Sequence, residues 1–178
     1  MAVCTVRVSQ GENTVTENGQ MVLRATCGNQ AAAAFLETIT TVLHFWDDLV
    51  DKDKPLPDSH INKCMWMVLV ELPRNPFYRA NFEDLNPVLV IAIQNWLAAN
   101  VMEAGDSGSD KQIAFITRSS YVDIVIQTAT ICGGFEFGQG IALEARRLWH
   151  GEGFDGYLAN LQKQFTDAEI MKGGQDEL

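Results

Sequence analysis

The spacing of apolar residues changes character near residue 29. Before that point the chain contains short β-prone runs and a turn signal at Asn18-Gly19, a pattern typical of a hairpin. From Asn29 onward, apolar residues recur every three or four positions, which is the spacing of one face of an α-helix. We therefore expect a short β-like N-terminal arm or hairpin over 1–28, a helical bundle over 29–172 and a frayed tail over 173–178.

Capping residues, prolines and glycine-rich loops divide the helical part into segments. Asn29, Asp58 and Ser109 are typical N-cap residues, and Pro87 after Asn86 is typical of the first helical position. About six helices joined by short links predict an all-α fold in the form of a helix bundle. The expected helices cover about 30–51, 59–72, 87–104, 110–132, 135–149 and 154–171.

The overall composition supports a single folded domain. The chain has 178 residues, of which 47% are apolar and 20% are charged. Those proportions are typical of a chain that buries its own core and not of a disordered one.

An excess of acidic residues narrows the range of partners. There are 23 Asp and Glu residues against 13 Lys and Arg, for a formal net charge of -10. Binding to a nucleic-acid backbone or an anionic membrane surface relies on clustered basic residues, so we expect neither. The start of the chain has no apolar segment typical of a signal peptide, and no apolar run reaches about 18 residues. We therefore expect a cytoplasmic protein without a membrane-spanning helix.

The most informative segment is the expected helix at 30–51. At 100° per residue, five polar residues of this helix fall on one narrow arc, together with two threonines, and most of the apolar residues fall on the opposite arc. This acidic face consists of Glu37, His44, Asp47, Asp48 and Asp51.

The simplest interpretation of the acidic face is the solvated side of an amphipathic helix. Two features of the sequence indicate that this face binds something in addition to water. Solvated faces usually mix charges of both signs, yet no Lys or Arg occurs between Arg24 and Lys52. The aspartates also lie at the C-terminal end of the helix, where the helix dipole disfavours negative charge. The pattern indicates a cation, either bound as a metal or supplied by a basic partner.

The run Asp47-Asp48-Leu49-Val50-Asp51 is a DDxxD sequence. It resembles the first metal motif of class I isoprenoid synthases, which are all-α enzymes that bind Mg²⁺ and a prenyl diphosphate. The resemblance implies Asp47, Asp48 and Asp51 as Mg²⁺ ligands. Asn100 and Glu103 are similar to part of the second metal motif of that family. However, Ala104 and Gly108 stand where that motif has a hydroxyl residue and a distal glutamate, which puts the second motif in doubt.

Other polar residues lie within apolar helices. Asp123 and Gln127 share one helical face, and a buried carboxylate needs a partner. The side chains therefore belong either to a structural hydrogen-bond network, with the partner of Asp123 on another helix, or to a pocket that faces the acidic helix. The same two alternatives apply to Asn100 and Glu103.

The glycines of the sequence GGFEFGQG are a further local signal. Gly134, Gly138 and Gly140 match no phosphate-binding loop, and small residues four positions apart allow two helices to pack closely. We therefore expect a packing role.

Two functional hypotheses remain, and the sequence leaves open whether the protein is an enzyme. The first, which we place ahead, is a non-catalytic interaction or assembly protein that meets a basic protein partner or self-associates. In general style the chain also resembles small helical accessory proteins encoded by tailed phages and prophages, which would place it in the host cytoplasm. The second is a Mg²⁺-dependent enzyme or binder that acts on a phosphorylated small molecule. Its metal ligands would be Asp47, Asp48 and Asp51, and its pocket candidates are Glu37, His44, Asn100, Glu103, Asp123 and Gln127.

Overall fold

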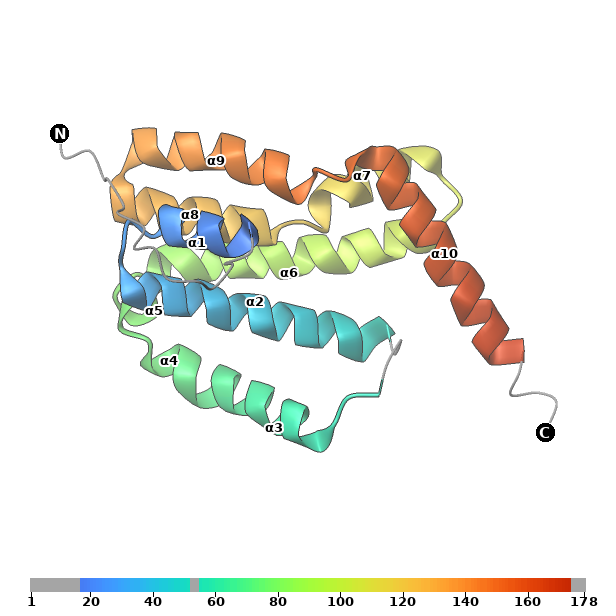
Figure 1. Cartoon of the computed structure of the whole chain (residues 1–178), viewed down its shortest axis with the longest axis horizontal. Coiled ribbons are helices and arrows are strands. Elements are labelled where there is room, and N and C mark those ends of the chain that lie inside the picture. Colours follow the sequence, from blue (N-terminus) through green and yellow to red (C-terminus); the bar gives the residue numbers. More distant parts are fainter. Residues whose placement is uncertain (1–16, 52–54, 174–178) are drawn as a thin grey trace.

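The computed structural model describes residues 17–51 and 55–173, and these residues form helices and the turns between them (Figure 1). The all-α fold class expected from the sequence is confirmed for this part of the chain. In chain order the elements are α1 (Glu17–Ala25), α2 (Gln30–Asp51), α3 (Asp58–Trp66), the π-helical turn η1 (Met67–Glu71), α4 (Leu72–Arg74), α5 (Pro76–Ala80), α6 (Phe82–Ala104), α7 (Gly108–Thr117), α8 (Tyr121–Gly133), α9 (Phe135–Trp149) and α10 (Gly153–Gly173).

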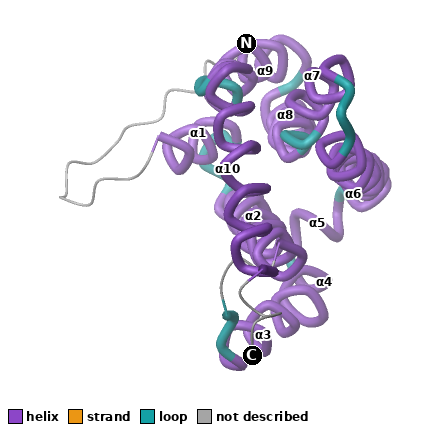
Figure 2. The backbone as a smooth tube through the Cα atoms, turned by 90° about the vertical axis from the view of Figure 1, so that its right-hand side faces the viewer, coloured by secondary structure: helices purple, strands orange, loops and turns teal. Residues whose placement is uncertain are grey.

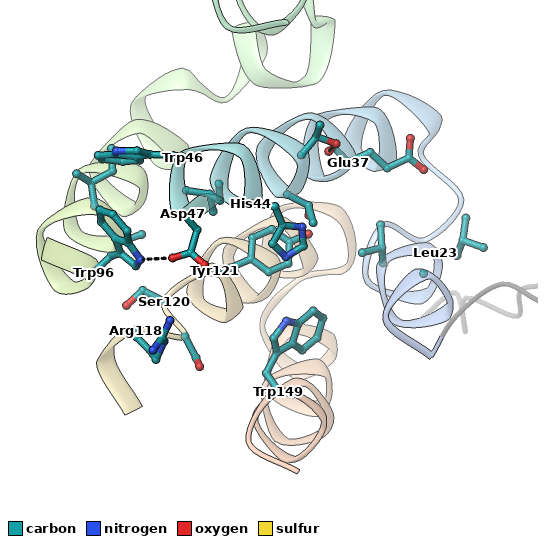
Figure 3. A pocket seen from close by; sticks show the side chains of 18 residues that line it. Leu23, Glu37, His44, Trp46, Asp47, Trp96, Arg118, Ser120, Tyr121 and Trp149 are labelled. Carbon is teal, nitrogen blue, oxygen red and sulfur yellow. Dashed lines mark hydrogen bonds between the residues drawn. The ribbon is translucent and has the colours of Figure 1, made fainter. Parts of the chain in front are cut away.

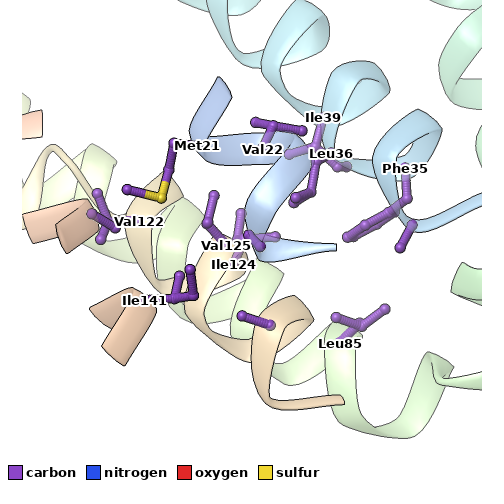
Figure 4. Packing of buried hydrophobic residues seen from close by; sticks show 14 of the residues in the cluster. Met21, Val22, Phe35, Leu36, Ile39, Leu85, Val122, Ile124, Val125 and Ile141 are labelled. Carbon is purple, nitrogen blue, oxygen red and sulfur yellow. The ribbon is translucent and has the colours of Figure 1, made fainter. Parts of the chain in front are cut away.

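The expected β-like arm over 1–28 is wrong for its described part. Residues 1–16 lie outside the described residues, but Glu17–Ala25 forms helix α1 and belongs to the bundle. Met21 and Ala25, one helical turn apart, are buried in the core, where α1 packs against α8 and α9 (Figure 4). Burial of this apolar face outweighs the weak local β-propensity of the segment.

The first long helix follows the prediction closely. Helix α2 runs over Gln30–Asp51, and Asn29 caps it, because the Ala32 backbone N–H donates to Asn29 Oδ1 at 3.1 Å. The expected cap at Asp58 is wrong by one position, since Pro57 occupies the N-cap of α3 and Asp58 lies in the first turn.

Two prolines lie inside helical segments that were expected to stop or start beside them. Helix α6 begins at Phe82, so the start predicted at Pro87 is wrong, and Pro87 lies in its second turn. The segment expected to stop at Leu72 continues through Pro73, directly after η1. A π-helical turn is rare and occurs mostly as a single turn within an α-helix; here it ends two residues before Pro73, which has no backbone N–H to donate.

The helix expected over 110–132 is two helices, α7 and α8, separated by a turn at residues 118–120. Ser107, not Ser109, caps α7 by accepting from the Asp110 backbone N–H. At the turn, the Ser120 hydroxyl donates to the Thr117 carbonyl at 2.6 Å, a local bond that competes with helix continuation. The turn places Arg118 near Asp47 of the acidic face of α2 (Figure 3).

The core lies where α1, α2, α6, α8 and α9 meet, with α5 at one end (Figures 1 and 4). Leu36 and Leu85 are fully buried there, and Phe35 stacks on Tyr78 with ring centroids 5.4 Å apart. Figure 2 shows α6 at one edge of this arrangement and α3 and α4 at another.

Gly138 allows the close approach of α9 to α8, as the packing role expected for this glycine requires. A Cβ atom at Gly138 would lie 2.2 Å from Thr130 Oγ1 and 3.2 Å from Thr130 Cα, and the second distance involves backbone that cannot rotate away. By contrast, nothing lies within 4 Å of a Cβ atom at Gly140. Only the first of these two glycines is therefore required by packing.

We expect Gly138→Ala to lower the free energy of unfolding by about 2 kcal/mol, because the added methyl group forces the two helices apart. Gly140→Ala is the matched control on the same helix. It should be neutral or stabilise by up to about 1 kcal/mol, because alanine favours the helix. Urea unfolding followed by circular dichroism measures both. Equal effects of the two substitutions would contradict the close-approach role of Gly138.

Candidate functional site

A pocket of about 680 Å³ lies between α1, α2, α6, the α7–α8 turn, α8 and α9 (Figure 3). Helix α2 lines it along the acidic face from Glu37 through His44 to Asp47. The volume is within the range of small-molecule and side-chain binding sites. Part of the acidic face therefore borders a cavity and not only open solvent.

Two aromatic pairs from four different helices form much of the pocket wall. Trp46 of α2 and Trp96 of α6 lie with ring centroids 4.8 Å apart. Tyr121 of α8 and Trp149 of α9 lie 5.7 Å apart. Aromatic faces carry negative electrostatic potential, so this wall favours an apolar or cationic guest over an anion.

The Asp47 side chain points into the pocket and accepts a hydrogen bond from Trp96 Nε1 at 3.3 Å (Figure 3). That donor is neutral, and within the described parts of the chain the carboxylate has no ion pair. The Arg118 guanidinium interacts electrostatically with Asp47 but forms its ion pair with Glu103, so Asp47 is only partly neutralised and still attracts a cation.

The three aspartates of the DDxxD sequence do not share the pocket. Asp47 lines it, whereas Asp48 and Asp51 lie outside its lining. In the described residues no group of three His, Cys, Asp or Glu side chains is placed to hold a metal ion. Magnesium binding through Asp47, Asp48 and Asp51 stays a prediction that titration must test.

Glu103 lies behind the pocket and not in its wall. The residue is 7% exposed, and its carboxylate accepts from the Arg118 guanidinium at 2.7 Å and from the Tyr157 hydroxyl at 2.6 Å. Arg118 does line the pocket. Burial lowers the pKa of Arg118, but the neighbouring Glu103 and Asp47 carboxylates outweigh burial and raise it overall. The guanidinium is therefore charged, and its ion pair with Glu103 neutralises it.

The remaining sequence candidates do not line the pocket. Asp123 forms an ion pair with Arg146 of α9, which confirms the expectation of a partner on another helix and supports a structural role. Asn100 and Gln127 are half-buried on α6 and α8.

Three hydroxyl groups around the pocket donate hydrogen bonds to backbone carbonyl groups of the protein. Thr40 and Thr41 donate to carbonyl groups one turn earlier in α2. The Tyr121 hydroxyl donates to the Leu36 carbonyl at 3.4 Å, and burial raises the pKa of Tyr121 to about 12. Tyr121 is therefore neutral near pH 7 and contributes its ring to the wall.

Sequence reasoning missed Trp96, Arg118 and Trp149 as pocket residues. Only the amphipathic pattern of α2 signalled part of the site. No family model, curated protein or solved structure matches the chain. The functional argument therefore follows from the geometry of the pocket, which combines an Asp47 carboxylate with aromatic walls.

Proposed function

We propose that the protein is a non-catalytic binding protein whose acidic helix face receives a cationic group of a basic partner. The observation that carries the proposal is the position of Asp47, which points into an aromatic-walled pocket and has a neutral hydrogen-bond donor as its neighbour. Aromatic faces combined with a carboxylate are the chemistry that binds ammonium groups.

The charge balance of the pocket supports a cation over an anion. Arg118 is the one Lys or Arg among the lining residues, and it is paired with Glu103. Glu37 and Asp47 then leave the pocket with a negative balance. A chain with a net charge of -10 also raises the local concentration of cations and repels phosphorylated ligands.

The volume of the pocket supports an ammonium group attached to an apolar stem. About 680 Å³ exceeds the size of a hydrated metal ion and suits a lysine-like side chain or a small organic ammonium compound. The aromatic wall would contact the methylene groups or methyl groups, while Asp47 would face the charge.

Choline and its uncharged carbon analogue 3,3-dimethylbutan-1-ol provide a matched pair of probes. We expect calorimetry to show binding of choline and at least tenfold weaker binding of the alcohol, because only choline carries the charge that Asp47 and the indole faces attract. Asp47→Asn keeps the shape of the side chain and its acceptor for Trp96, and it should weaken choline binding about tenfold. Equal affinity for both probes would contradict the proposal.

Asp48→Asn is the matched control, since Asp48 neighbours Asp47 in sequence but lies outside the pocket lining. Choline binding should be unchanged in this variant. A Mn²⁺ titration of the same proteins distinguishes a magnesium site from the proposed cation pocket. Heat of Mn²⁺ binding that is lost in both Asp47→Asn and Asp48→Asn, with no choline binding to the unmodified protein, would favour a metal site over the cation pocket.

A further inference from the structure

Helix α6 presents an exposed apolar stripe that no described helix covers. It lies at the edge of the bundle (Figure 2), and only 17% of its most apolar 18-residue window is buried. From Pro87 onward the exposed side chains recur along one arc of the helix, and seven of these eight are apolar, whereas Glu83 and Asp84 in the first turn are exposed and acidic. The eight residues of the stripe are Pro87, Val90, Ile91, Gln94, Leu97, Ala98, Val101 and Ala104.

From these residues we infer that the stripe is the interface of a two-fold symmetric dimer, in which α6 packs antiparallel to α6 of a second copy with Gln94 at the axis. This inference does not rest on the cation pocket, which α6 lines with Ala92, Ile93 and Trp96 and not with the residues of the stripe. Three observations support a second copy as the occupant: the absence of charge along the stripe, its internal symmetry and its area.

The absence of charge selects an uncharged partner surface. No Asp, Glu, Lys, Arg or His occurs between Leu85 and Met102, in a chain whose net charge is -10. A second copy is repelled wherever acidic surfaces meet. Along the charge-free α6 stripe two copies can approach without this repulsion. A basic partner, by contrast, would have no carboxylate to pair with there.

The order of residues along the stripe is self-complementary. In an antiparallel pair centred on residue 94, position 94 − n faces position 94 + n of the other copy. Ile91 then faces Leu97, and the facing pairs from 87 to 101 are apolar, whereas Ala104 at the end of the stripe faces Asp84. Gln94 faces Gln94 of the second copy. An amide side chain both donates and accepts hydrogen bonds, so the two glutamine amides can bond to each other. A single polar residue on an apolar seam also fixes the register.

The area predicts a reversible dimer. The stripe from Pro87 to Ala104 is about 26 Å long at 1.5 Å per residue. On a helix surface it provides on the order of 450 Å² per copy, so about 900 Å² in total, which is below the roughly 1,000 Å² of a stable interface and within the range of weak, transient ones. We therefore expect a dissociation constant on the order of 10 µM.

Sedimentation velocity over a range of concentrations tests the dimer directly. The unmodified protein should change from monomer to dimer across the micromolar range. Ile91→Glu places a charge opposite Leu97 and should raise the dissociation constant at least tenfold. Leu69→Glu on η1 is the matched control, because Leu69 is 66% exposed and Ile91 is 58% exposed, and it should dimerise normally. A monomer at every concentration, or equal loss in both variants, would overturn the proposal.

Cysteine substitution tests the register, including the case in which Ile91→Glu fails to fold. Gln94→Cys should form a covalent dimer with a short bismaleimide, because the two thiols meet at the axis. Val101→Cys should give no more crosslinked dimer than the unmodified protein, because the two introduced thiols would be about 21 Å apart along the helices. Stronger crosslinking at 101 than at 94 would overturn the register.

The same helix has the length and composition of a membrane-crossing segment, so a bilayer is the competing occupant. Flotation of the unmodified protein with phosphatidylcholine vesicles distinguishes the two. Protein that stays at the bottom of the gradient, together with concentration-dependent dimerisation, supports the dimer. Protein that floats with the vesicles, and loses this property in Ile91→Glu, would overturn it.

Discussion

Phe35→Ala should lower the free energy of unfolding by about 4 kcal/mol, the middle of the range for replacing a buried aromatic side chain with alanine. Phe35 is fully buried at the junction of α2 with α5. Its ring stacks on Tyr78 at 5.4 Å and contacts Phe77 at 6.0 Å. Alanine would remove these ring contacts and leave a cavity that the surrounding helices cannot fill. Urea unfolding monitored by tryptophan fluorescence measures the loss.

Phe82→Ala is the control for this prediction. Phe82 also packs against Tyr78, with ring centroids 5.5 Å apart, but it is 49% exposed. We expect a loss of at most about 1 kcal/mol, because its ring is only partly removed from water. Similar losses in the two variants would show that the core does not centre on Phe35.

Much of the fold follows from the helical spacing of apolar residues. The bounds of α2 and α9 agree with prediction, because both have strong amphipathic patterns and clear end signals at Asn29 and Gly134. Helix α1 could not be predicted in the same way. Its short apolar run at Met21 and Val22 is compatible with either a strand or a helix, and only contact with α8 decides between them.

Two other differences also arise from tertiary context. The separation of α7 from α8 depends on Ser120, whose hydroxyl donates to the Thr117 carbonyl and accepts from Asn95 of α6 at 3.0 Å. The second bond joins residues 25 positions apart, so no local signal could reveal it. Likewise, the early start of α6 at Phe82 includes residues that the Asn86-Pro87 signal had excluded.

The candidate site was predictable along one helix only. Periodicity placed Glu37, His44 and Asp47 on one side of α2, and all three line the pocket. The opposite walls come from Trp96, Trp149 and other residues that are far away in sequence. Their spacing within α6 and α9 does not distinguish a pocket wall from ordinary packing. Because of the same ambiguity, Glu103 was predicted to be a pocket residue, whereas Glu103 lies behind Arg118.

The position of Glu103 connects the pocket with the C-terminal helix. Asp47 and Arg118 both line the pocket, and Arg118 is paired with Glu103. Glu103 in turn accepts from Tyr157 of α10, and the Arg118 guanidinium lies 6.0 Å from the centre of the Tyr157 ring. Because one buried carboxylate joins α6, the α7–α8 turn and α10, its removal should affect more than a local contact.

Glu103→Ala should lower the free energy of unfolding by about 3 kcal/mol. The substitution leaves the largely buried Arg118 guanidinium without its partner, and breaking one side of such a pair usually costs about 3–5 kcal/mol. It also removes the acceptor of the Tyr157 hydroxyl. Partial exposure of the Arg118 side chain, 27%, keeps the expected loss at the lower end. Urea unfolding followed by circular dichroism measures it.

Glu144→Ala is the matched control, because it breaks an ion pair of similar length, 3.1 Å to Arg24, whose side chains are 48% and 55% exposed. An exposed pair contributes at most about 1 kcal/mol, so this variant should unfold almost like the unmodified protein. Glu103→Gln keeps an acceptor for Arg118 and Tyr157 but loses the charge, and its loss should fall between the other two. If Glu103→Ala and Glu144→Ala lost equal stability, the buried carboxylate would not be the link between α6 and α10, because burial is what distinguishes the two pairs.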